Sequence, residues 1–416
     1  MKIMLDVNYI RTEPDKVKIG LKAKNVAPSL VDDFLALDEN WRNTTKEYDD
    51  LRARLNALSK ERKIDEAKVV KGKIKELEGD LTKMEQSRDE LLNRFPNIPF
   101  PDWPVGKDES ENKVLREVGK KPEFDFQPSD YLTLAEKHGI VDTERAAKVV
   151  GTRFGYLFKE AVLLELALVQ FAFEKLIKKG FIPVIPPVMI KPDVYKAMGR
   201  LAGAQEEERY RLKNDDLYLV GSAEHTIGPI HMDEVLDAKD LPRRYVGFST
   251  CFRREAGSYG KDTKGILRVH QFDKVEMFSF AHPDKSKEEH EFMLSVQEEL
   301  MTELGLHYHV VQICAGDMGW TDAAQYDIEV WLPGQNQYRE TQSCSNTTDF
   351  QARGINCKFR TSNNSNIKPE YLHMLNATAF PIGRMLIAII ENFQQKDRSI
   401  AIPKVLQKYT GFKKIG

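Results

Sequence analysis

The chain has 416 residues, and its 62 Lys and Arg against 64 Asp and Glu give a formal net charge of −2. With 41% hydrophobic and 30% charged residues, the composition excludes an intrinsically disordered chain, and the length predicts roughly two or three domains. The charge balance excludes a uniformly basic nucleic-acid coat but permits a local basic patch.

The cysteines are widely spaced and form no C-x-x-C pair: they are Cys251, Cys314, Cys344 and Cys357. This pattern argues against a disulfide framework or a structural zinc site and fits the reducing cytoplasm. The longest apolar stretch, Val162 to Leu176, is interrupted by charged and polar residues, and residues 1–6 contain no apolar run of signal-peptide length. We therefore expect a cytoplasmic protein that does not enter the membrane.

Residues 30–95 predict two long helices, because apolar residues recur at alternating spacings of four and three. The first seam consists of Leu30, Phe34, Leu37, Trp41, Thr44, Tyr48, Leu51, Leu55 and Leu58. The second consists of Ala67, Val70, Ile74, Leu77, Leu81, Met84, Arg88, Leu91 and Phe95, with one polar lapse at Arg88. The segment between the seams predicts the tip of an antiparallel hairpin, although a break in the helical register remains an alternative.

The distal half of this hairpin is basic. Residues 52–75 contain nine Lys and Arg against three acids, a difference of +6. An ordinary solvated coiled-coil surface would account for such a run, and so would a finger that binds the phosphates of a nucleic acid. The residues alone leave both readings open.

Prolines at 96, 99, 101 and 104 end the helices, so the sequence predicts one domain over residues 1–104 and a second over 105–416. The second region has short β-rich runs at 217–220, 245–251, 274–280, 309–314 and 327–332. It also has amphipathic helices at 158–179 and 286–304. Because regular helices do not separate the strands, we expect an α+β fold with an antiparallel sheet flanked by helices.

Polar residues are densest between Phe252 and Glu276. Two strands joined by a glycine-rich loop at 257–265 would bring Arg253, Glu255, Phe272 and Glu276 close together. The loop's glycines and lysines suit a cover over phosphates. Three further polar runs, at 220–224, 338–346 and 376–384, each have an ordinary explanation as turn or cap chemistry. Arg384 is the least ordinary, because a cation at a helix N-terminus opposes the helix dipole.

Taken together, these runs resemble the three signature motifs of class II aminoacyl-tRNA synthetases, and in particular the seryl-tRNA synthetase family. Motif 1 resembles GFIPVIPP at 180–187, motif 2 the segment 252–276, and motif 3 the Gly383–Arg384 pair with its helix. The seryl branch is indicated by TCFRREAG at 250–257, HQFDKVE at 270–276, YDIEVWLP at 326–333 and SCSN at 343–346. The resemblance covers essentially the whole chain.

The resemblance implies a class II antiparallel catalytic sheet, an N-terminal antiparallel coiled-coil arm and a homodimer. It also implies that ATP and Mg²⁺ activate L-serine as seryl-adenylate, and that serine is then transferred to the 3′ end of tRNA-Ser, which is bound across the dimer. In this family the arm reaches the long variable arm of the tRNA. The sequence leaves open whether a selenocysteine tRNA is also charged, and no zinc is expected.

The resemblance carries roles over to particular residues. The catalytic set is Arg253, Glu340 and Arg384. The serine-binding set is Ser222, Ala223, Glu224, Arg253, Glu276, Asn376 and Thr378. The ATP-binding set is Arg253, Arg254, Glu255, Val269, Phe272, Glu340, Thr341, Gln342, Ser343 and Arg384, with Glu340 and Ser343 holding Mg²⁺. The tRNA-binding set is Arg52, Arg54, Lys60, Arg62, Lys63, Lys68 and Lys71.

Three alternative functions fit the sequence less well. A ligase that loads a small amino acid onto a carrier protein would lack the long basic hairpin. A class II synthetase for threonine, proline or glycine is disfavoured by Glu276 and the SCSN run. A non-enzymatic coiled-coil adaptor would need losses at Arg253, Glu255, Glu340 or Arg384, and all four are present. Departures from the family pattern are Ser222 in place of Thr, Ala377–Thr378–Ala379 in place of Gly-Ser-Gly, and Phe380–Pro381–Ile382 in place of Leu-Ala-Val.

Overall fold

The computed structural model describes residues 4–256, 262, 264–361 and 368–416. The chain divides into two compact units, Met1–Ile98 and Pro99–Gly416. The division falls within the proline-rich segment, six residues before the boundary predicted at 104. Most of the glycine-rich loop at 257–265, expected to cover phosphates, lies outside the described residues.

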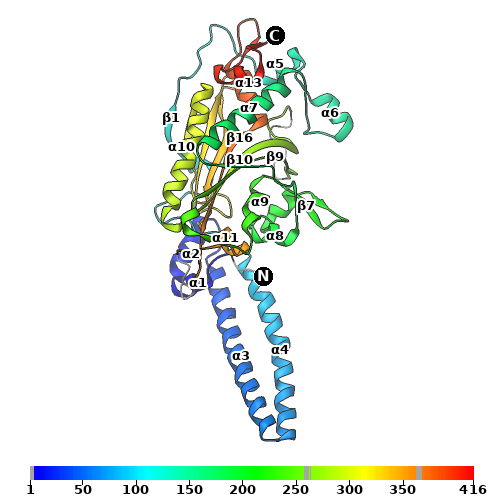
Figure 1. Ribbon diagram of the computed structural model, residues 1–416, viewed down its shortest axis with the longest axis vertical. Helices are drawn as coiled ribbons and strands as arrows, with labels where there is room; N and C mark the ends of the chain where they lie inside the picture. The colour runs from blue at the N-terminus through cyan, green and yellow to red at the C-terminus, as the bar shows by residue number, and fades with distance from the viewer. Residues whose placement is uncertain (1–3, 257–261, 263, 362–367) are drawn as a thin grey trace. The chain divides into compact units, whose positions relative to one another are not determined.

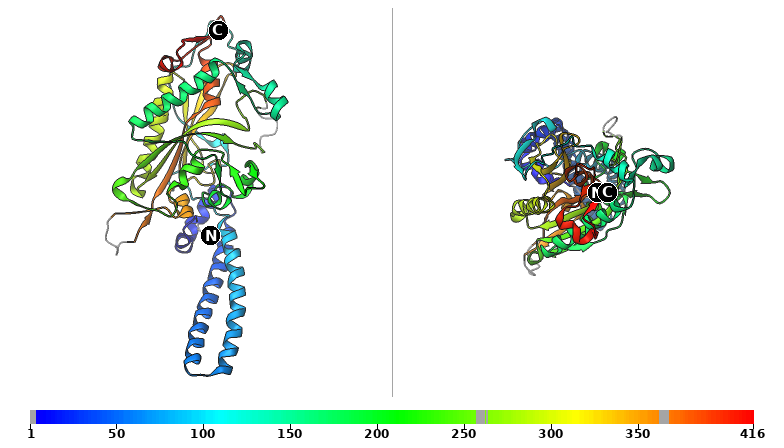
Figure 2. Two further views of the ribbon diagram at one scale, coloured as in Figure 1. Left: turned by 45° about the vertical axis from the view of Figure 1, so that its right-hand side comes forward. Right: turned by 90° about the horizontal axis from the view of Figure 1, so that it is seen from above.

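The first unit is helical. Short helices α1 (Val7–Thr12) and α2 (Pro14–Ala23) precede two long ones, α3 (Ser29–Lys60) and α4 (Ile64–Leu92). Helices α3 and α4 run side by side (Figures 1 and 2), and the turn between them spans residues 61–63. Near this turn the two seams meet in a cluster formed by Leu58, Val70 and Ile74. The predicted antiparallel hairpin is confirmed, and the alternative of a register break is wrong.

Arg88, the one polar residue in the second seam, has a specific partner on the facing helix. Its Nε donates to Asp38 Oδ1 at 2.8 Å, and its guanidinium lies over the ring of Trp41, 4.8 Å from the ring centre. Asp38 is fully buried and also accepts hydrogen bonds from Arg11. Burial by itself would raise the pKa of Asp38, but the hydrogen bonds from these arginines outweigh it and lower the pKa. A buried ion cluster therefore replaces an apolar contact in the seam.

The second unit is built on an eight-stranded sheet with the order β1-β11-β12-β13-β16-β10-β9-β4. The strands are β1 (Lys113–Val118), β11 (Tyr308–Gln312), β12 (Ala324–Leu332), β13 (Gln337–Asn346), β16 (His373–Pro381), β10 (Gln271–Ala281), β9 (Arg243–Phe252) and β4 (Ile182–Val184). Every neighbouring pair is antiparallel except β4 with β9, which is parallel. The predicted α+β class and antiparallel sheet are confirmed.

Helices cover one face of this sheet (Figure 1). They are α7 (Glu160–Lys178), α10 (Ser286–Leu304) and α12 (Ile382–Asn392), and α5 (Tyr131–His138) packs against α12. Their apolar residues and every second residue of the central strands form one large core, in which Phe171 stacks on Phe380. This face is closed by packing, so polar residues that reach a ligand must stand on the opposite face.

Shorter elements complete the unit. They are β2 (Val141–Asp142), α6 (Thr143–Val150), β3 (Tyr156–Leu157), β5 (Met189–Ile190), α8 (Pro192–Ala197), β6 (Arg211–Leu212), β7 (Leu217–Leu219), α9 (Glu224–Ile227), β8 (Val235–Asp237), α11 (Phe350–Ile355), β14 (Lys358–Arg360), β15 (Glu370–Tyr371), β17 (Ile400–Ala401), α13 (Gln407–Thr410) and β18 (Lys414–Ile415). None of the described helices is long and apolar enough to cross a membrane.

Two β-bulges interrupt the central strands. On β13 the register with β12 shifts at Thr341, and on β16 the register with β10 shifts at Ala379. A bulge inserts one extra residue, so the residues beyond it exchange faces of the sheet. Buried Gln342 donates to the bulged Ala379 carbonyl at 2.7 Å, and buried Gln297 donates to the Thr378 carbonyl at 2.7 Å. Two glutamines thus satisfy carbonyls at the irregularity on β16.

Candidate active site

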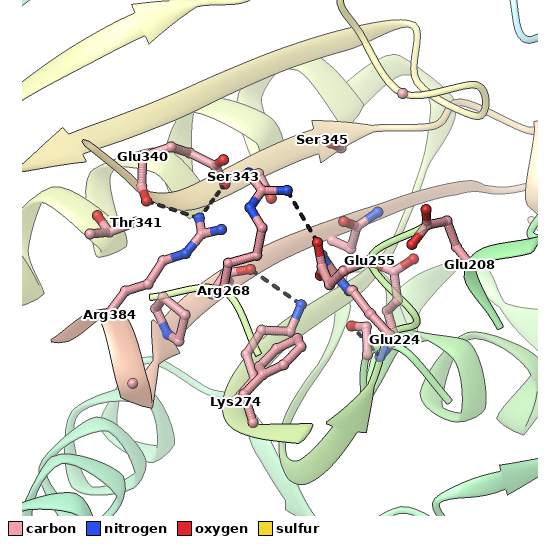
Figure 3. Close-up of a pocket in the computed structure, with 18 of the residues that line it drawn as sticks. Glu208, Glu224, Glu255, Arg268, Lys274, Glu340, Thr341, Ser343, Ser345 and Arg384 are labelled. Atoms are coloured by element: carbon pink, nitrogen blue, oxygen red, sulfur yellow. Dashed lines mark hydrogen bonds and ion pairs between the residues drawn. The ribbon is translucent and has the colours of Figure 1, made fainter. Parts of the chain in front are cut away.

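A cavity of about 610 Å³ opens on the polar face of the sheet. Twelve of the predicted site residues line it: Ser222, Glu224, Arg253, Glu255, Val269, Phe272, Glu340, Thr341, Ser343, Asn376, Thr378 and Arg384. They come from five segments that are distant in the sequence, and Figure 3 shows several of them pointing into one space. The fold therefore brings most of the predicted serine and ATP residues together.

The two bulges decide which side chains reach this cavity. In a regular strand Glu340 and Ser343 would point to opposite faces, because neighbouring side chains alternate. The extra residue at Thr341 places Glu340 on the same face as Ser343, and both line the cavity. On β16, Asn376 and Thr378 line the cavity, whereas Ala377 and Ala379 belong to the core on the other face.

Four predicted residues do not line the cavity. Ala223 is fully buried at the start of α9, and Arg254 is exposed. Gln342 points to the core face, where its side chain bonds the Ala379 carbonyl. Glu276 is 1% exposed and lies behind Lys274 and Thr378, which do line the wall.

Glu276 is held by two neighbours. Lys274 Nζ lies 2.5 Å from Glu276 Oε2, and Thr378 Oγ1 donates to the same oxygen at 3.3 Å. Burial raises the pKa of Glu276 above its usual value, and the charge of Lys274 opposes this shift. Asn376 Nδ2, on the same wall, is buried without a hydrogen-bond partner among the described residues. This end of the cavity thus presents an ammonium, a hydroxyl and an unused amide donor.

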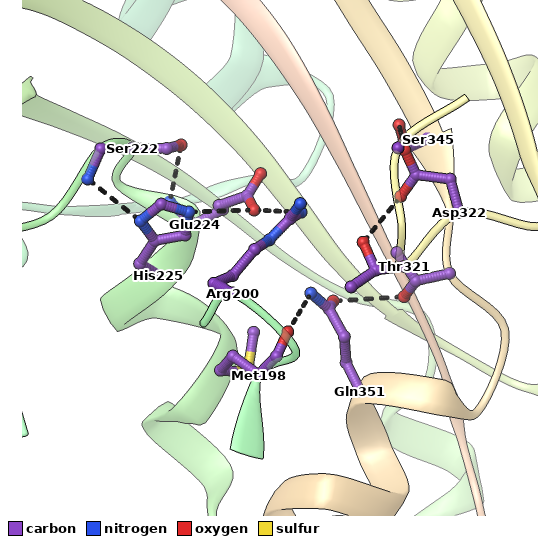
Figure 4. A network of polar contacts seen from close by, with 12 residues as sticks. Met198, Arg200, Ser222, Glu224, His225, Thr321, Asp322, Ser345 and Gln351 are labelled. Carbon is purple, nitrogen blue, oxygen red and sulfur yellow. Dashed lines mark hydrogen bonds and ion pairs between the residues drawn. The ribbon is translucent and has the colours of Figure 1, made fainter. Parts of the chain in front are cut away.

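A second buried ion pair also lines the cavity (Figure 4). Arg200 forms an ion pair with Glu224, whose backbone N–H donates to Ser222 Oγ at 3.2 Å. Burial disfavours the charged form of Glu224, but the charge of Arg200 prevails and lowers its pKa. Burial also lowers the pKa of His225 to about 3, so this imidazole is neutral.

Arg253 and Glu255 lie beyond the strand rather than on it. Strand β9 ends at Phe252, and Glu255 has a φ of 52°, which turns the chain toward the loop. Arg253 and Glu255 therefore do not share a strand face, although their spacing of two residues predicts one. Both still line the cavity: Arg253 lies over Phe272, 5.2 Å from the ring centre, and Glu255 pairs with Arg268 at 3.1 Å.

Arg384 and Glu340 meet at the other end of the cavity. Arg384 Nη1 lies 3.2 Å from Glu340 Oε1 and donates to the Glu340 carbonyl at 2.9 Å. The charge of Arg384 is the main cause that lowers the pKa of Glu340, and Arg253 adds to it. Glu340 is therefore the anionic partner that offsets the unfavourable position of Arg384 at the start of a helix.

The predicted Mg²⁺ ligands fit an ion that is held partly by phosphates and water. Among the described residues no group of three or more His, Cys, Asp or Glu side chains is placed to hold a metal ion. Mg²⁺ commonly binds one or two protein oxygens and completes its shell with phosphates and water. The ionised Glu340 carboxylate and the Ser343 hydroxyl, on one face of the cavity, fit that kind of site.

The predicted tRNA-binding residues lie on the first unit. All seven of them are exposed around the distal ends of α3 and α4. Arg62, Lys63, Lys68 and Lys71 also line a groove of about 500 Å³ at the hairpin tip, together with the exposed Ile64. The groove combines cations with an apolar floor.

Sequence reasoning missed several residues of the cavity wall. They include Arg200, Arg209, Arg268, Lys274, Asp317, Asp322 and Gln325. Lys274 carried a usable signal, because it stands two residues from both Phe272 and Glu276 on one strand face. Arg200 and Arg209 carried none, since they flank a short 3-10 helix, Gly203–Glu208, and belong to no periodic strand or α-helix.

Comparison with known proteins agrees with this geometry. Residues 4–99 match the seryl-tRNA synthetase N-terminal domain, and residues 208–393 match the tRNA synthetase class II core domain (G, H, P, S and T). A serine--tRNA ligase from Pyrococcus horikoshii is 44% identical over 446 residues, covering 99% of this chain and 97% of the relative. The chain belongs to the seryl-tRNA synthetase family.

Two further relatives extend the match. A serine--tRNA ligase from Dictyoglomus turgidum is 42% identical and covers 99% of both chains. The crystal structure of seryl-tRNA synthetase from Pyrococcus horikoshii complexed with ATP superposes with a TM-score of 0.94, at 42% identity, over 99% of both chains. As a seryl-tRNA synthetase family member, the chain has the expected class II core and N-terminal domain.

Proposed function

We propose that the protein is a serine--tRNA ligase that activates L-serine with ATP and transfers it to the 3′ end of tRNA-Ser. The observation that carries the proposal is the cavity itself, where Thr378, backed by the buried Glu276, lies at one end and Arg253, Phe272 and Arg384 lie along the wall. Full-length similarity to serine--tRNA ligases supports the same activity. The region 1–104 serves as the tRNA-binding arm and 105–416 as the aminoacylation domain.

Serine occupies the end of the cavity formed by Ser222, Glu224, Asn376 and Thr378. The ionised Glu224 receives the α-ammonium group, and the hydroxyl bonds the Glu276–Thr378 pair. A site that buries a polar group rejects an analogue lacking the matching hydroxyl by a factor on the order of 10⁴, because the buried group is left unpaired. Alanine is excluded in this way, whereas threonine, which differs by one methyl group, is discriminated by shape, by roughly 10- to 200-fold. Ala377 takes no part in this selection, since it packs in the core.

ATP lies along the part of the cavity wall that carries Arg253 and Arg384. Phe272 and Arg384 hold the adenine ring between them, Glu255 accepts from its amino group, and Arg253 neutralises the α-phosphate. The serine carboxylate attacks the α-phosphorus, an oxygen–phosphorus bond forms, and the bond to pyrophosphate breaks. The chain contributes alignment and charge rather than a covalent intermediate.

Glu340 and Ser343 would hold Mg²⁺ on the phosphates. When bound, the ion supplies charge neutralisation for the departing pyrophosphate. Arg384 keeps Glu340 ionised and fixes its position before any ligand enters.

The arm recognises tRNA by shape and backbone, which suits exposed Lys and Arg on a rigid rod. We also propose a homodimer in which the arm of one subunit serves the other. Exposed apolar residues on α7 and around β4, such as Leu163, Leu166, Ile182 and Ile185, support such a contact. Four unpaired, buried cysteines support a cytoplasmic location.

Aminoacylation with purified components tests the proposal. With ATP and L-serine, the protein should attach labelled serine to tRNA-Ser, and periodate oxidation of the tRNA 3′ ribose should abolish the reaction. A chain that activates serine but transfers it only to a carrier protein would contradict the proposal and support the carrier-ligase alternative.

A further inference from the structure

The cations of the cavity are not all matched by carboxylates. Six Lys and Arg side chains line it, and within the described chain four of them form one-to-one ion pairs. These pairs are Arg200–Glu224, Arg268–Glu255, Lys274–Glu276 and Arg384–Glu340. The two cations left over are Arg253 and Arg209. Arg253 already has a role at the α-phosphate, but Arg209 has none.

Arg209 is held in place without a carboxylate. Its guanidinium lies 5.6 Å from the centre of the Tyr195 ring, and a Cβ atom on Gly221 would come within 2.7 Å of Arg209 Nη1. Glycine at 221 therefore leaves the space that the guanidinium fills. Arg209 Nε is buried and has no hydrogen-bond partner among the described residues.

Placing the Arg209 guanidinium there without an ion-pair partner costs free energy unless a bound ligand supplies the partner. A buried charge without a partner loses its hydration and has no ion pair to replace it. Burial, together with the like charges of Arg253 and Arg200, lowers the pKa of Arg209 by more than Tyr195 and the charge of Glu224 raise it. An anion bound in the cavity would relieve both effects.

The position of Arg209 indicates which anionic group it binds. It lies against Gly221, immediately before Ser222 and Glu224, and so at the amino-acid end of the cavity. Arg253 also contacts Gly221, since its Nε donates to the Gly221 carbonyl at 3.1 Å, but its guanidinium lies over Phe272, the ring assigned to adenine, and so faces the nucleotide. A guanidinium also matches the planar fork of a carboxylate.

We propose that Arg209 binds the α-carboxylate of the amino-acid substrate, while Arg253 serves the α-phosphate. The proposal deepens the proposed function and rests on it. One carboxylate oxygen stays with Arg209 while the other attacks the α-phosphorus, and pyrophosphate leaves with the electrons of the broken bond. Formation of the mixed anhydride removes the carboxylate charge, so Arg209 binds the free amino acid rather than the adenylate.

Serine-dependent ATP–pyrophosphate exchange tests this with Arg209→Met, Arg209→Lys and a matched control, Arg211→Met. Arg211 is exposed and pairs with Asp216 at 2.8 Å, away from the cavity wall. Because a hydrogen bond to a charged group contributes about 1.5–3 kcal/mol, Arg209→Met should raise the KM for serine roughly 10- to 150-fold. The KM for ATP should stay within about twofold, Arg209→Lys should recover part of the loss, and the control should resemble the wild type.

A substrate analogue separates carboxylate binding from a structural role. L-Serinamide keeps the ammonium and hydroxyl groups but lacks the carboxylate, and its inhibition constant against serine should be the same for wild type and Arg209→Met. An equal rise in the serinamide constant, or an unchanged KM for serine, would overturn the proposal. If Arg209→Met does not fold, the same comparison is made with Arg209→Lys. A wild-type chain that shows no exchange with serine would instead overturn the proposed function.

Discussion

Lys274 and Glu276 stand two residues apart on β10, with Nζ and Oε2 2.5 Å from each other and both side chains buried. The spacing puts them on one face of the strand, and the bulge at Ala379 places Thr378 directly opposite Glu276. The carboxylate that we assign to the serine hydroxyl is therefore reached through an ammonium and a hydroxyl that line the wall.

Glu276→Ala should abolish serine activation while sparing ATP binding. The variant removes the acceptor for the substrate hydroxyl and leaves Lys274 without its partner. We expect serine-dependent pyrophosphate exchange to fall by a factor on the order of 10³ or more, with ATP affinity by calorimetry nearly unchanged. Glu298→Ala, which removes an acid paired with Arg116 outside the cavity, is the control. Exchange at wild-type efficiency in Glu276→Ala would refute the assignment.

The raised pKa of Glu276 predicts a pH dependence for serine but not for ATP. The ionised carboxylate is the better acceptor, so kcat/KM for serine should rise with pH through a midpoint above the usual pKa of a glutamic acid. Lys274→Met removes the charge that opposes this shift, so the midpoint should move to still higher pH. A midpoint that is the same in both proteins would show that another group titrates.

Gln342→Leu should lower stability rather than ATP affinity. The sequence placed Gln342 among the ATP residues, but its side chain is buried and satisfies the Ala379 carbonyl at the bulge. Leaving a buried carbonyl unsatisfied costs about 1–3 kcal/mol, which urea unfolding would measure. A raised KM for ATP with an unchanged free energy of unfolding would favour the assignment of Gln342 to ATP binding.

Two neighbouring acids, Glu165 on α7 and Asp273 on β10, predict that the stability of the fold depends on pH. Burial and a hydrogen bond with Asp273 raise the pKa of Glu165 to about 8. An acid whose pKa is raised by folding stabilises most below its unfolded pKa and loses that contribution as the pH rises through the folded value. The wild-type free energy of unfolding should therefore fall between mildly acidic pH and pH about 8, and Glu165→Gln should flatten this slope. An equal slope in both proteins would contradict the pairing.

Removing the hairpin tip should separate the two steps of the reaction. Deleting residues 56–67 takes away Lys60, Arg62 and Lys63 without touching the cavity, so serine-dependent exchange should persist while charging of tRNA declines. A milder triple variant, with Arg62, Lys68 and Lys71 changed to Gln, should raise the KM for tRNA and weaken its salt dependence.

Lys83 provides the matched control for the arm. It is exposed on α4 but outside the tip groove, so Lys83→Gln should leave tRNA charging unaltered. Equal losses of exchange and charging after the tip deletion would count against the assignment of the arm to tRNA.

The parts of the fold that follow a regular period could be predicted from the sequence. The seams of α3 and α4 and the strands β9, β10 and β12 all stand where their apolar spacing indicated. The bulges could not be predicted, because one extra residue at Thr341 or Ala379 leaves no periodic signal, yet it decides that Glu340 faces the cavity and Gln342 does not. Arg209 was missed for a similar reason: only the tertiary fold sets it against Gly221.

The most direct test is pyrophosphate exchange with a panel of amino acids on the wild-type protein. The account predicts rapid exchange with L-serine, losses of several orders of magnitude with alanine, glycine and proline, which lack the hydroxyl, and a smaller loss with threonine, which differs from serine by one methyl group. Exchange driven equally well by any of these, or no exchange with serine, would contradict it.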